Sequence, residues 1–221
     1  MIKISDVVLE IINGDEIALE AIRMGILNLS AYAKKIQPLI SERTYKSVSI
    51  SAIVTALSRM KNKLNNVSPL RPVVTIEDMS IKSPLVEISY EKTVKLAQIA
   101  SKLDTRLLQK SSFYTITYGV DEISLIVSQD LKNKILEHFN VNPKGVYENL
   151  VAITLRFIEK DYIEVPNMIY ALVSALASKR INIIEVVSTF TEISFIMREK
   201  DMKQTIDALK YFFHQEKIPL K

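Results

Sequence analysis

Residues 122–127 read Glu-Ile-Ser-Leu-Ile-Val, and residues 192–197 read Glu-Ile-Ser-Phe-Ile-Met. An Asp-Leu-Lys segment (130–132) follows the first, and an Asp-Met-Lys segment (201–203) follows the second. Each is continued by an amphipathic helical pattern. A repeat of this length is too long for a solenoid unit and fits a small α+β module. The chain is therefore predicted to contain one structural unit twice.

Both repeats show the same order of elements: strand, helix, strand, strand, helix. In the first, alternation at Val86 and Ile88 is followed by a helical stripe over 96–107 and by a hairpin. In the second, a strand over 151–157 is followed by a helical stripe over 169–176 and by a hairpin. The hairpin strands are 113–118 with 122–127, and 181–188 with 192–197. Fourth strands are expected at 141–149 and 217–221, so each unit is predicted to be ferredoxin-like, βαββαβ, with both helices on one face of an antiparallel sheet.

The first 64 residues show helical periodicity and no strand pattern. A first helix is expected to be capped by Ser5, and a third to begin near Asn28 and to bend or stop at Pro38. The last helix should follow Ser49. The predicted fold class is therefore α+β. The predicted segments are a helical domain over 1–64, a linker over 65–72, and two units over 73–145 and 146–221.

Composition argues against catalysis and against a cofactor. The chain has no cysteine and two histidines, so a thiolate or histidine metal site is not expected. Its four glycines are scattered, whereas a phosphate-binding loop needs them clustered. No apolar run reaches the roughly 18–20 residues of a membrane span, and the N-terminus lacks the pattern of a secretory signal. We therefore expect a cytoplasmic protein that is not an enzyme and does not bind a membrane.

The second repeat resembles an ACT domain, a small-ligand sensor module, and the chain over roughly 80–214 is similar to the tandem ACT pairs of aspartokinases. Pro166-Asn167, Arg180 to Ile183, and Thr191 to Ile196 with Asp201 carry the resemblance. The family usually has Pro-Gly where this chain has Pro166-Asn167, and asparagine is the next-best residue for a left-handed backbone. The first repeat lacks these motifs, so it is expected to serve as scaffold.

The resemblance implies a homodimer that binds an amino acid or similar small ligand at an interface between ACT units. Glu164, Val165, Asn167 and Met168 would lie beside this ligand from the loop and helix start, and Asn182 from the facing strand. A ligand carboxylate is favoured at a helix N-terminus. The alternative is a structural module that regulates a partner enzyme without binding a small ligand.

The helical domain more weakly resembles a helix-turn-helix or winged-helix module, which would make DNA the output. Residues 1–64 carry most of the excess positive charge of a chain whose formal net charge is +4. About eight residues separate the two relevant helices, more than the turn of the simple motif. A solvated face of a helical dimerisation domain is the competing interpretation. The candidate DNA-contacting residues are Ser51, Thr55, Ser58, Arg59, Asn62 and Lys63.

Overall fold

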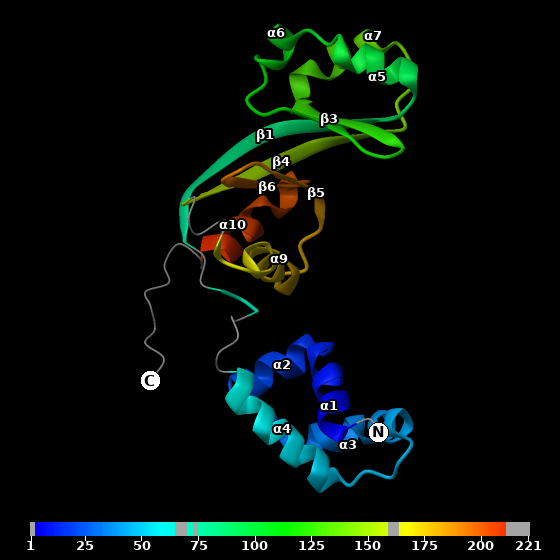
Figure 1. Cartoon of the computed structure of the whole chain (residues 1–221). Coiled ribbons are helices and arrows are strands. Elements are labelled where there is room, and N and C mark those ends of the chain that lie inside the picture. The colour runs from blue at the N-terminus through cyan, green and yellow to red at the C-terminus, as the bar shows by residue number, and fades with distance from the viewer. Residues whose placement is uncertain (1–2, 65–69, 73–74, 159–163, 211–221) are drawn as a thin grey trace. The chain divides into compact units, whose positions relative to one another are not determined.

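The computed structural model describes residues 3–64, 70–72, 75–158 and 164–210, with the backbone alone at 61–64 and 105 (Figure 1). The chain forms two compact units, Met1–Pro72 and Val73–Lys221. We call them the helical unit and the sheet unit.

Four helices build the helical unit: α1 (Ile4–Asn13), α2 (Glu16–Arg23), α3 (Leu29–Thr44) and α4 (Ile50–Leu64). Asp15 caps α2 by accepting the amide of Ala18 at 3.0 Å, and its other oxygen accepts the Tyr32 hydroxyl of α3 at 3.0 Å. Burial, followed by that hydrogen bond, raises the pKa of Tyr32. One carboxylate therefore both starts a helix and ties it to its neighbour. The buried apolar side chains that form the core come from all four helices.

Two helix boundaries differ from the expectation. Ser5 does not cap α1, because the helix already includes Ile4 and the capping position is Lys3. Pro38 does not stop the third helix, which continues to Thr44. Ile36 and Ile40 on either side of the proline are both buried in the core, and this packing offsets the hydrogen bond that proline cannot donate.

The sheet unit contains one antiparallel sheet in the order β2-β3-β1-β4-β6-β5. Its strands are β1 (Ile76–Glu91), β2 (Thr115–Tyr118), β3 (Glu122–Ser128), β4 (Gly145–Phe157), β5 (Ile183–Ser188) and β6 (Glu192–Arg198). The predicted α+β class is confirmed, because a helical region is followed by an antiparallel sheet with two α/β arrangements of strands and helices. The order βαββαβ is continuous in the chain for the first of them.

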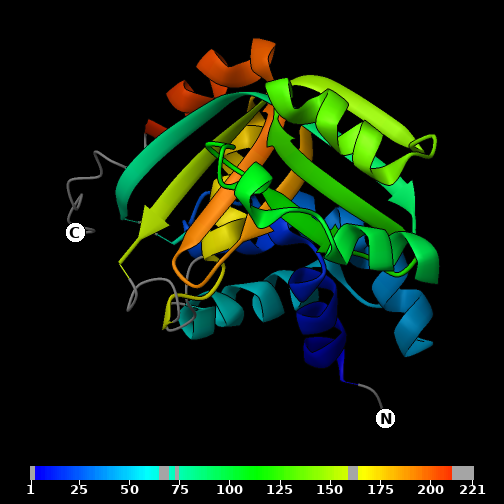
Figure 2. The same ribbon diagram turned by 90° about the horizontal axis from the view of Figure 1, so that it is seen from above.

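The long strands β1 and β4 lie side by side and are used by both arrangements (Figure 2). The first half-sheet consists of β2, β3, residues 85–91 and residues 145–150. The second half-sheet consists of residues 76–82, residues 150–157, β6 and β5. Pairing shifts register between Lys82 and Leu85, where Ser83-Pro84 interrupts the ladder.

The fourth strand of the second half-sheet is therefore formed by residues 76–82, which precede the first half-sheet in the chain. Residues 217–221, which were expected to fill this place, lie outside the described residues. Residues 145–149 do close the first half-sheet, as the pattern predicted. The predicted border between the units, at 145–146, lies at the start of a strand that both half-sheets use.

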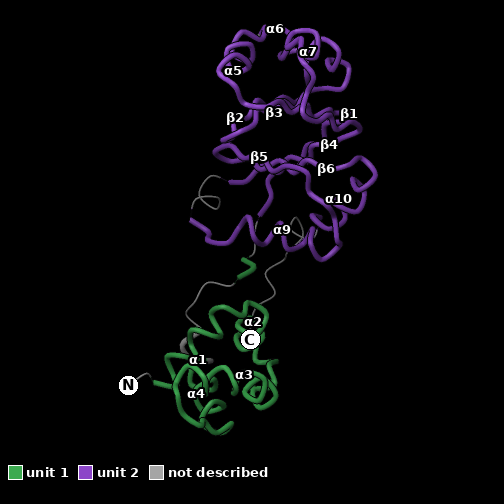
Figure 3. Tube along the Cα trace, turned by 90° about the vertical axis from the view of Figure 1, so that its right-hand side faces the viewer, with its two compact units in different colours: residues 1–72 green, residues 73–221 purple. Residues whose placement is uncertain are grey.

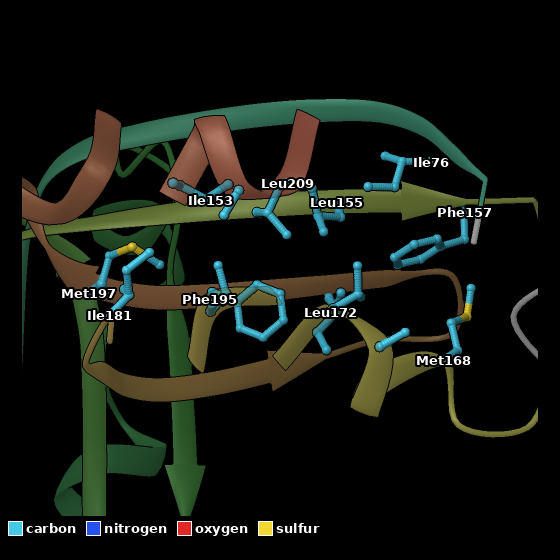
Figure 4. Packing of buried hydrophobic residues seen from close by; sticks show 14 of the residues in the cluster. Ile76, Ile153, Leu155, Phe157, Met168, Leu172, Ile181, Phe195, Met197 and Leu209 are labelled. Atoms are coloured by element: carbon cyan, nitrogen blue, oxygen red, sulfur yellow. The ribbon is translucent and has the colours of Figure 1, made fainter. Parts of the chain in front are cut away.

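Helices cover the outer face of each half-sheet, and Figure 3 shows the two rows of strands between them. The first half-sheet packs on α5 (Val94–Ser101), α6 (Thr105–Leu108) and α7 (Lys132–Phe139), which follows the 3-10 turn η1 (Gln129–Leu131). The second packs on α9 (Met168–Ser178) and α10 (Met202–Lys210), which follows η2 (Glu199–Asp201). Apolar side chains from strands and helices meet in the second core, as Figure 4 shows.

The opposite faces of the two half-sheets meet in what we call the inner layer. Its apolar part combines both halves: Leu85, Ile126, Leu150, Ala152 and Ile196 are buried there, with Phe113 and Ile184 packed against them. Because side chains alternate along a strand, successive residues of β3 face the outer helices and this layer in turn. The sheet unit is thus layered as helices, strands, strands and helices.

Candidate functional site

The turn before α9 carries four of the five predicted ligand residues. Asn167 precedes the helix in a left-handed conformation (φ 65°, ψ 17°), and its side chain makes no capping hydrogen bond. Met168 is buried in the core, Val165 is half-buried, and Glu164 is exposed. Asparagine tolerates this backbone conformation better than other non-glycine residues. The first-turn amides of α9, which have no partner within the helix, receive no cap from Asn167.

Asn182, the fifth predicted residue, is exposed and stands directly before β5. It lies at the other end of the unit: Figure 4 shows Met168 and Ile181, the neighbours of Asn167 and Asn182, at opposite ends of the core. The helix between them, α9, has 11 residues and so spans about 16 Å. One chain therefore does not bring Asn182 to the other four residues.

A hollow of about 650 Å³ lies on the inner side of the second half-sheet, beside Ile184. Its charged side chains are Glu148, Arg198, Glu199 and Lys200. Glu148 pairs with Lys132 at 2.5 Å, and Glu199 accepts the Ser83 hydroxyl at 3.2 Å. The volume suits a small ligand, and both signs of charge are present. The sequence offered no signal for this hollow, because its cations, Arg198 at the end of β6 and Lys200 after it, stand where ordinary surface residues are common.

Two carboxylates that the sequence analysis passed over face the inner layer. Glu87 and Glu185 border a second hollow, of about 220 Å³, which Ile184 also lines. Each has one buried oxygen without a hydrogen-bond partner among the described residues. A signal was present for Glu185, which interrupts an otherwise apolar run in β5, whereas Glu87 lies in a strand with several other charged residues.

The candidate DNA-contacting residues lie on α4. Ser51, Thr55, Ser58 and Arg59 are exposed, whereas the side chains of Asn62 and Lys63 lie outside the described residues. The Thr55 hydroxyl donates to the carbonyl of Ser51 at 2.9 Å. Thr55 and Arg59 also line a groove of about 460 Å³ between α4 and α1, which contains Asp6. Residues 45–49 separate α3 from α4, so the connection is shorter than the expected eight residues.

Within the described ranges, no group of three or more histidine, cysteine or acidic side chains is placed to hold a metal ion. His138 contacts the carbonyl of Ile99 through Nε2 at 2.9 Å, joining α7 to α5. His214 lies outside the described residues. None of the helices in the described part of the chain is long and apolar enough to cross a membrane.

The chain matches no family model and no curated protein. Solved structures do match. An aspartate kinase from Clostridium acetobutylicum is 18% identical with a TM-score of 0.51, over 63% of this chain and 35% of that chain. The regulatory subunit of aspartate kinase from Thermus thermophilus, in its ligand-free form, is 16% identical with a TM-score of 0.50, over 63% and 99%. The same subunit from Thermus flavus is 13% identical with a TM-score of 0.51, also over 63% and 99%.

These matches concern the fold, because the identities are low. This chain spans about a third of the Clostridium enzyme and nearly all of each Thermus regulatory subunit. The matched share of this chain, 63%, is larger than the helical unit Met1–Pro72 could supply. The structural neighbours are thus regulatory, ACT-type regions of aspartate kinases.

Proposed function

We propose that this protein is a non-catalytic regulator that senses an amino acid or a similar small ligand through its ACT-like units. The carrying observation is that the sheet unit has the fold of aspartate kinase regulatory subunits, which are matched over 99% of their length. In this proposal 1–64 is the output module, 65–72 the linker, 73–145 the divergent ACT-like unit that serves as scaffold, and 146–221 the unit that binds the ligand.

The ligand would lie between two copies of the chain. The helix start at Asn167, with Glu164, Val165 and Met168, would face Asn182 of a second copy, and the separation of about 16 Å within one chain supports this arrangement. The uncapped first turn of α9 favours a carboxylate. The Asn182 amide can both donate to a ligand and accept from it.

A thermal-shift screen against the twenty amino acids tests this proposal, since a ligand that binds only the folded state must raise its stability. We expect one or a few amino acids to raise the Tm, and Asn182→Ala to abolish the rise with little effect on the ligand-free Tm. Ser112→Ala is the matched control, because Ser112 holds the corresponding place before β2 in the first half-sheet and is exposed.

Other outcomes have separate meanings. A shift that survives Asn182→Ala but is lost in Arg198→Ala would move the site to the hollow beside Ile184. If none of the twenty amino acids raises the Tm, the alternative is favoured, in which the module regulates a partner enzyme without binding a small ligand. Sedimentation with and without ligand would test the homo-oligomer.

For the output we propose the exposed face of α4, with Arg59 as its described cation. If this face contacts DNA, binding to mixed duplex should fall steeply with salt and weaken in Arg59→Ala. Lys46→Ala, which removes an exposed cation outside α4, is the control. No binding at about 50 mM salt, where non-specific association is strong, would leave a partner protein as the output.

A further inference from the structure

The inner layer contains a pair of carboxyl groups whose surroundings differ from those of the other acidic residues described above. Glu87 on β1 and Glu185 on β5 border the same hollow, of about 220 Å³, and come from different half-sheets. One oxygen of each, Oε2, is buried and has no hydrogen-bond partner among the described residues. Burying an unpaired carboxylate oxygen is costly, so the pair needs a compensating partner.

The two groups are arranged differently. Glu87 accepts hydrogen bonds at Oε1 from the hydroxyls of Ser124 at 3.0 Å and Ser89 at 3.3 Å. These donors fix its carboxylate and prepare it to act as an acceptor. The described residues offer no such donors to Glu185. It lies at a β-bulge, where the pairing shifts between Ile183 and Glu185, and both Ile184 and Glu185 line the inner hollow.

The other charged groups around the hollow are already engaged. Glu122 at its rim pairs with Lys144, and Glu91 and Asp121 also interact with that lysine. Lys92 donates to the carbonyl of Gly119 at 2.6 Å. Thr117 and Ser124, from β2 and β3, carry no charge. No cation in the described part of the chain is thus paired with Glu87 or Glu185.

We propose that Glu87 and Glu185 form a protonation-dependent latch between the half-sheets: one proton held by the pair keeps β5 against the first half-sheet, and its loss loosens that contact. Glu185 is the donor and Glu87 the acceptor. Two like charges in a desolvated space repel, so one shared proton is the arrangement of lower free energy. Burial, followed by the charge of Glu87, raises the pKa of Glu185, which agrees with this assignment.

The sign of the pH dependence follows. Because the folded-state pKa of Glu185 is raised above 4.5, its contribution is fully present below the unfolded value and is lost as pH rises through the folded value. Glu185→Gln keeps a neutral donor at every pH. The variant should therefore match wild type near pH 4.5 and exceed its Tm by about 2–4 °C near pH 8.

The test measures backbone hydrogen exchange of residues 183–188 in the full chain, from about pH 4.5 to about pH 8. Each observed rate is compared with the intrinsic rate at the same pH, which gives the protection of the strand. We expect protection of this strand to fall with pH in wild type and in Glu137→Gln, the control at an exposed glutamate of α7, but to stay constant in Glu185→Gln. An equal pH dependence in all three proteins overturns the latch. Protection that rises with pH overturns it too, since that is the sign of a cation bound by two carboxylates.

Wild type alone provides a second readout that does not depend on a variant folding well. Infrared difference spectra should show a protonated carboxyl band at pH values where ordinary glutamates are ionised. The absence of this band in wild type, or its persistence in a folded Glu185→Gln variant, overturns the assignment.

Discussion

The two half-sheets share one plan and differ most in two places. In the first, Lys92 and Thr93 separate β1 from α5, and Thr93 caps the helix by accepting the amide of Leu96 at 3.1 Å. In the second, residues 158–167 separate β4 from α9, and the helix starts at a left-handed Asn167 without a side-chain cap. The first connection leaves no room for a ligand loop, whereas the second does.

The second difference lies on the inner faces. Relative to the paired strands β3 and β6, Glu87 of the first half-sheet holds the place of Ala152 in the second, opposite Ile126 and Ile196. The outer faces correspond closely, since Ile123 and Ile193 are both fully buried against helices. Packing thus keeps the outer faces largely alike, and the larger differences between the halves lie in one connection and one inner surface.

The largest expected effect tests whether the halves behave as one body. Leu125→Ala in the first half-sheet and Phe195→Ala in the second should each lower the free energy of unfolding by about 2–5 kcal/mol, because both side chains are fully buried. Since β1 and β4 run through both halves, hydrogen exchange should accelerate in both after either change. Val120→Ala, at an exposed position, should have little effect. Acceleration confined to the substituted half would show that the halves unfold separately.

A smaller effect separates the two helix starts. Thr93→Ala should cost about 1 kcal/mol through the lost cap, and Asn167→Ala about 1–2 kcal/mol through left-handed backbone strain. Serine should have opposite effects at the two positions. Thr93→Ser should keep most of the stability, because its hydroxyl can replace the cap, whereas Asn167→Ser should be destabilised, because serine does not relieve the left-handed backbone strain. Glycine at 167 should be nearly neutral. Denaturant unfolding measures these differences, and a Thr93→Ser variant that is as unstable as Thr93→Ala would refute the cap.

The smallest effect concerns Tyr90, which holds the place of Leu155 in the second half-sheet, opposite Ile123 and Ile193. Its ring stacks on Phe139 at 4.1 Å between centroids, and its buried hydroxyl has no partner among the described residues. Tyr90→Phe keeps the ring and removes the unpaired hydroxyl, so we expect a gain on the order of 1 kcal/mol.

The same variant has a pH signature. Burial raises the pKa of Tyr90 to about 12, from an ordinary value of 10.0. The contribution of the neutral phenol is therefore complete below pH 10 and is lost as pH rises through 12. Between pH 10 and pH 12, the free energy of unfolding should therefore fall more in wild type than in Tyr90→Phe. A destabilised Tyr90→Phe would mean that the hydroxyl does find a partner.

Local sequence patterns predicted many of the strands and helices correctly. The Glu-Ile-Ser segments became β3 and β6, and the alternation in each preceding run correctly placed β2 and β5 beside them. The sharing of β1 was not predictable. Residues 76–82 pair with residues 152–157, which lie 70 to 81 positions later, and alternation within a segment does not state which distant segment it will meet. At Pro38, a local rule was outweighed by core packing.

The candidate site could be read only in part. Pro166-Asn167 indicated a left-handed backbone conformation, and Asn167 adopts it in the structure. That Asn182 lies at the far end of α9 depends on the direction of each element, which a sequence pattern leaves unstated. The pairing of Glu87 with Glu185 depends on how two half-sheets meet, so each glutamate alone carried no sign of the other.

The order of the strands also has a consequence during synthesis on the ribosome. Residues 76–82 emerge first, but their partner segment of β4 emerges 70 to 81 residues later, several seconds at ordinary translation rates. Residues 85–150 can meanwhile close the first half-sheet, since they are contiguous in the chain. The earliest strand must wait with its backbone groups unpaired, which is a known hazard for aggregation, and Glu77, Asp78 and Lys82 place charges along it.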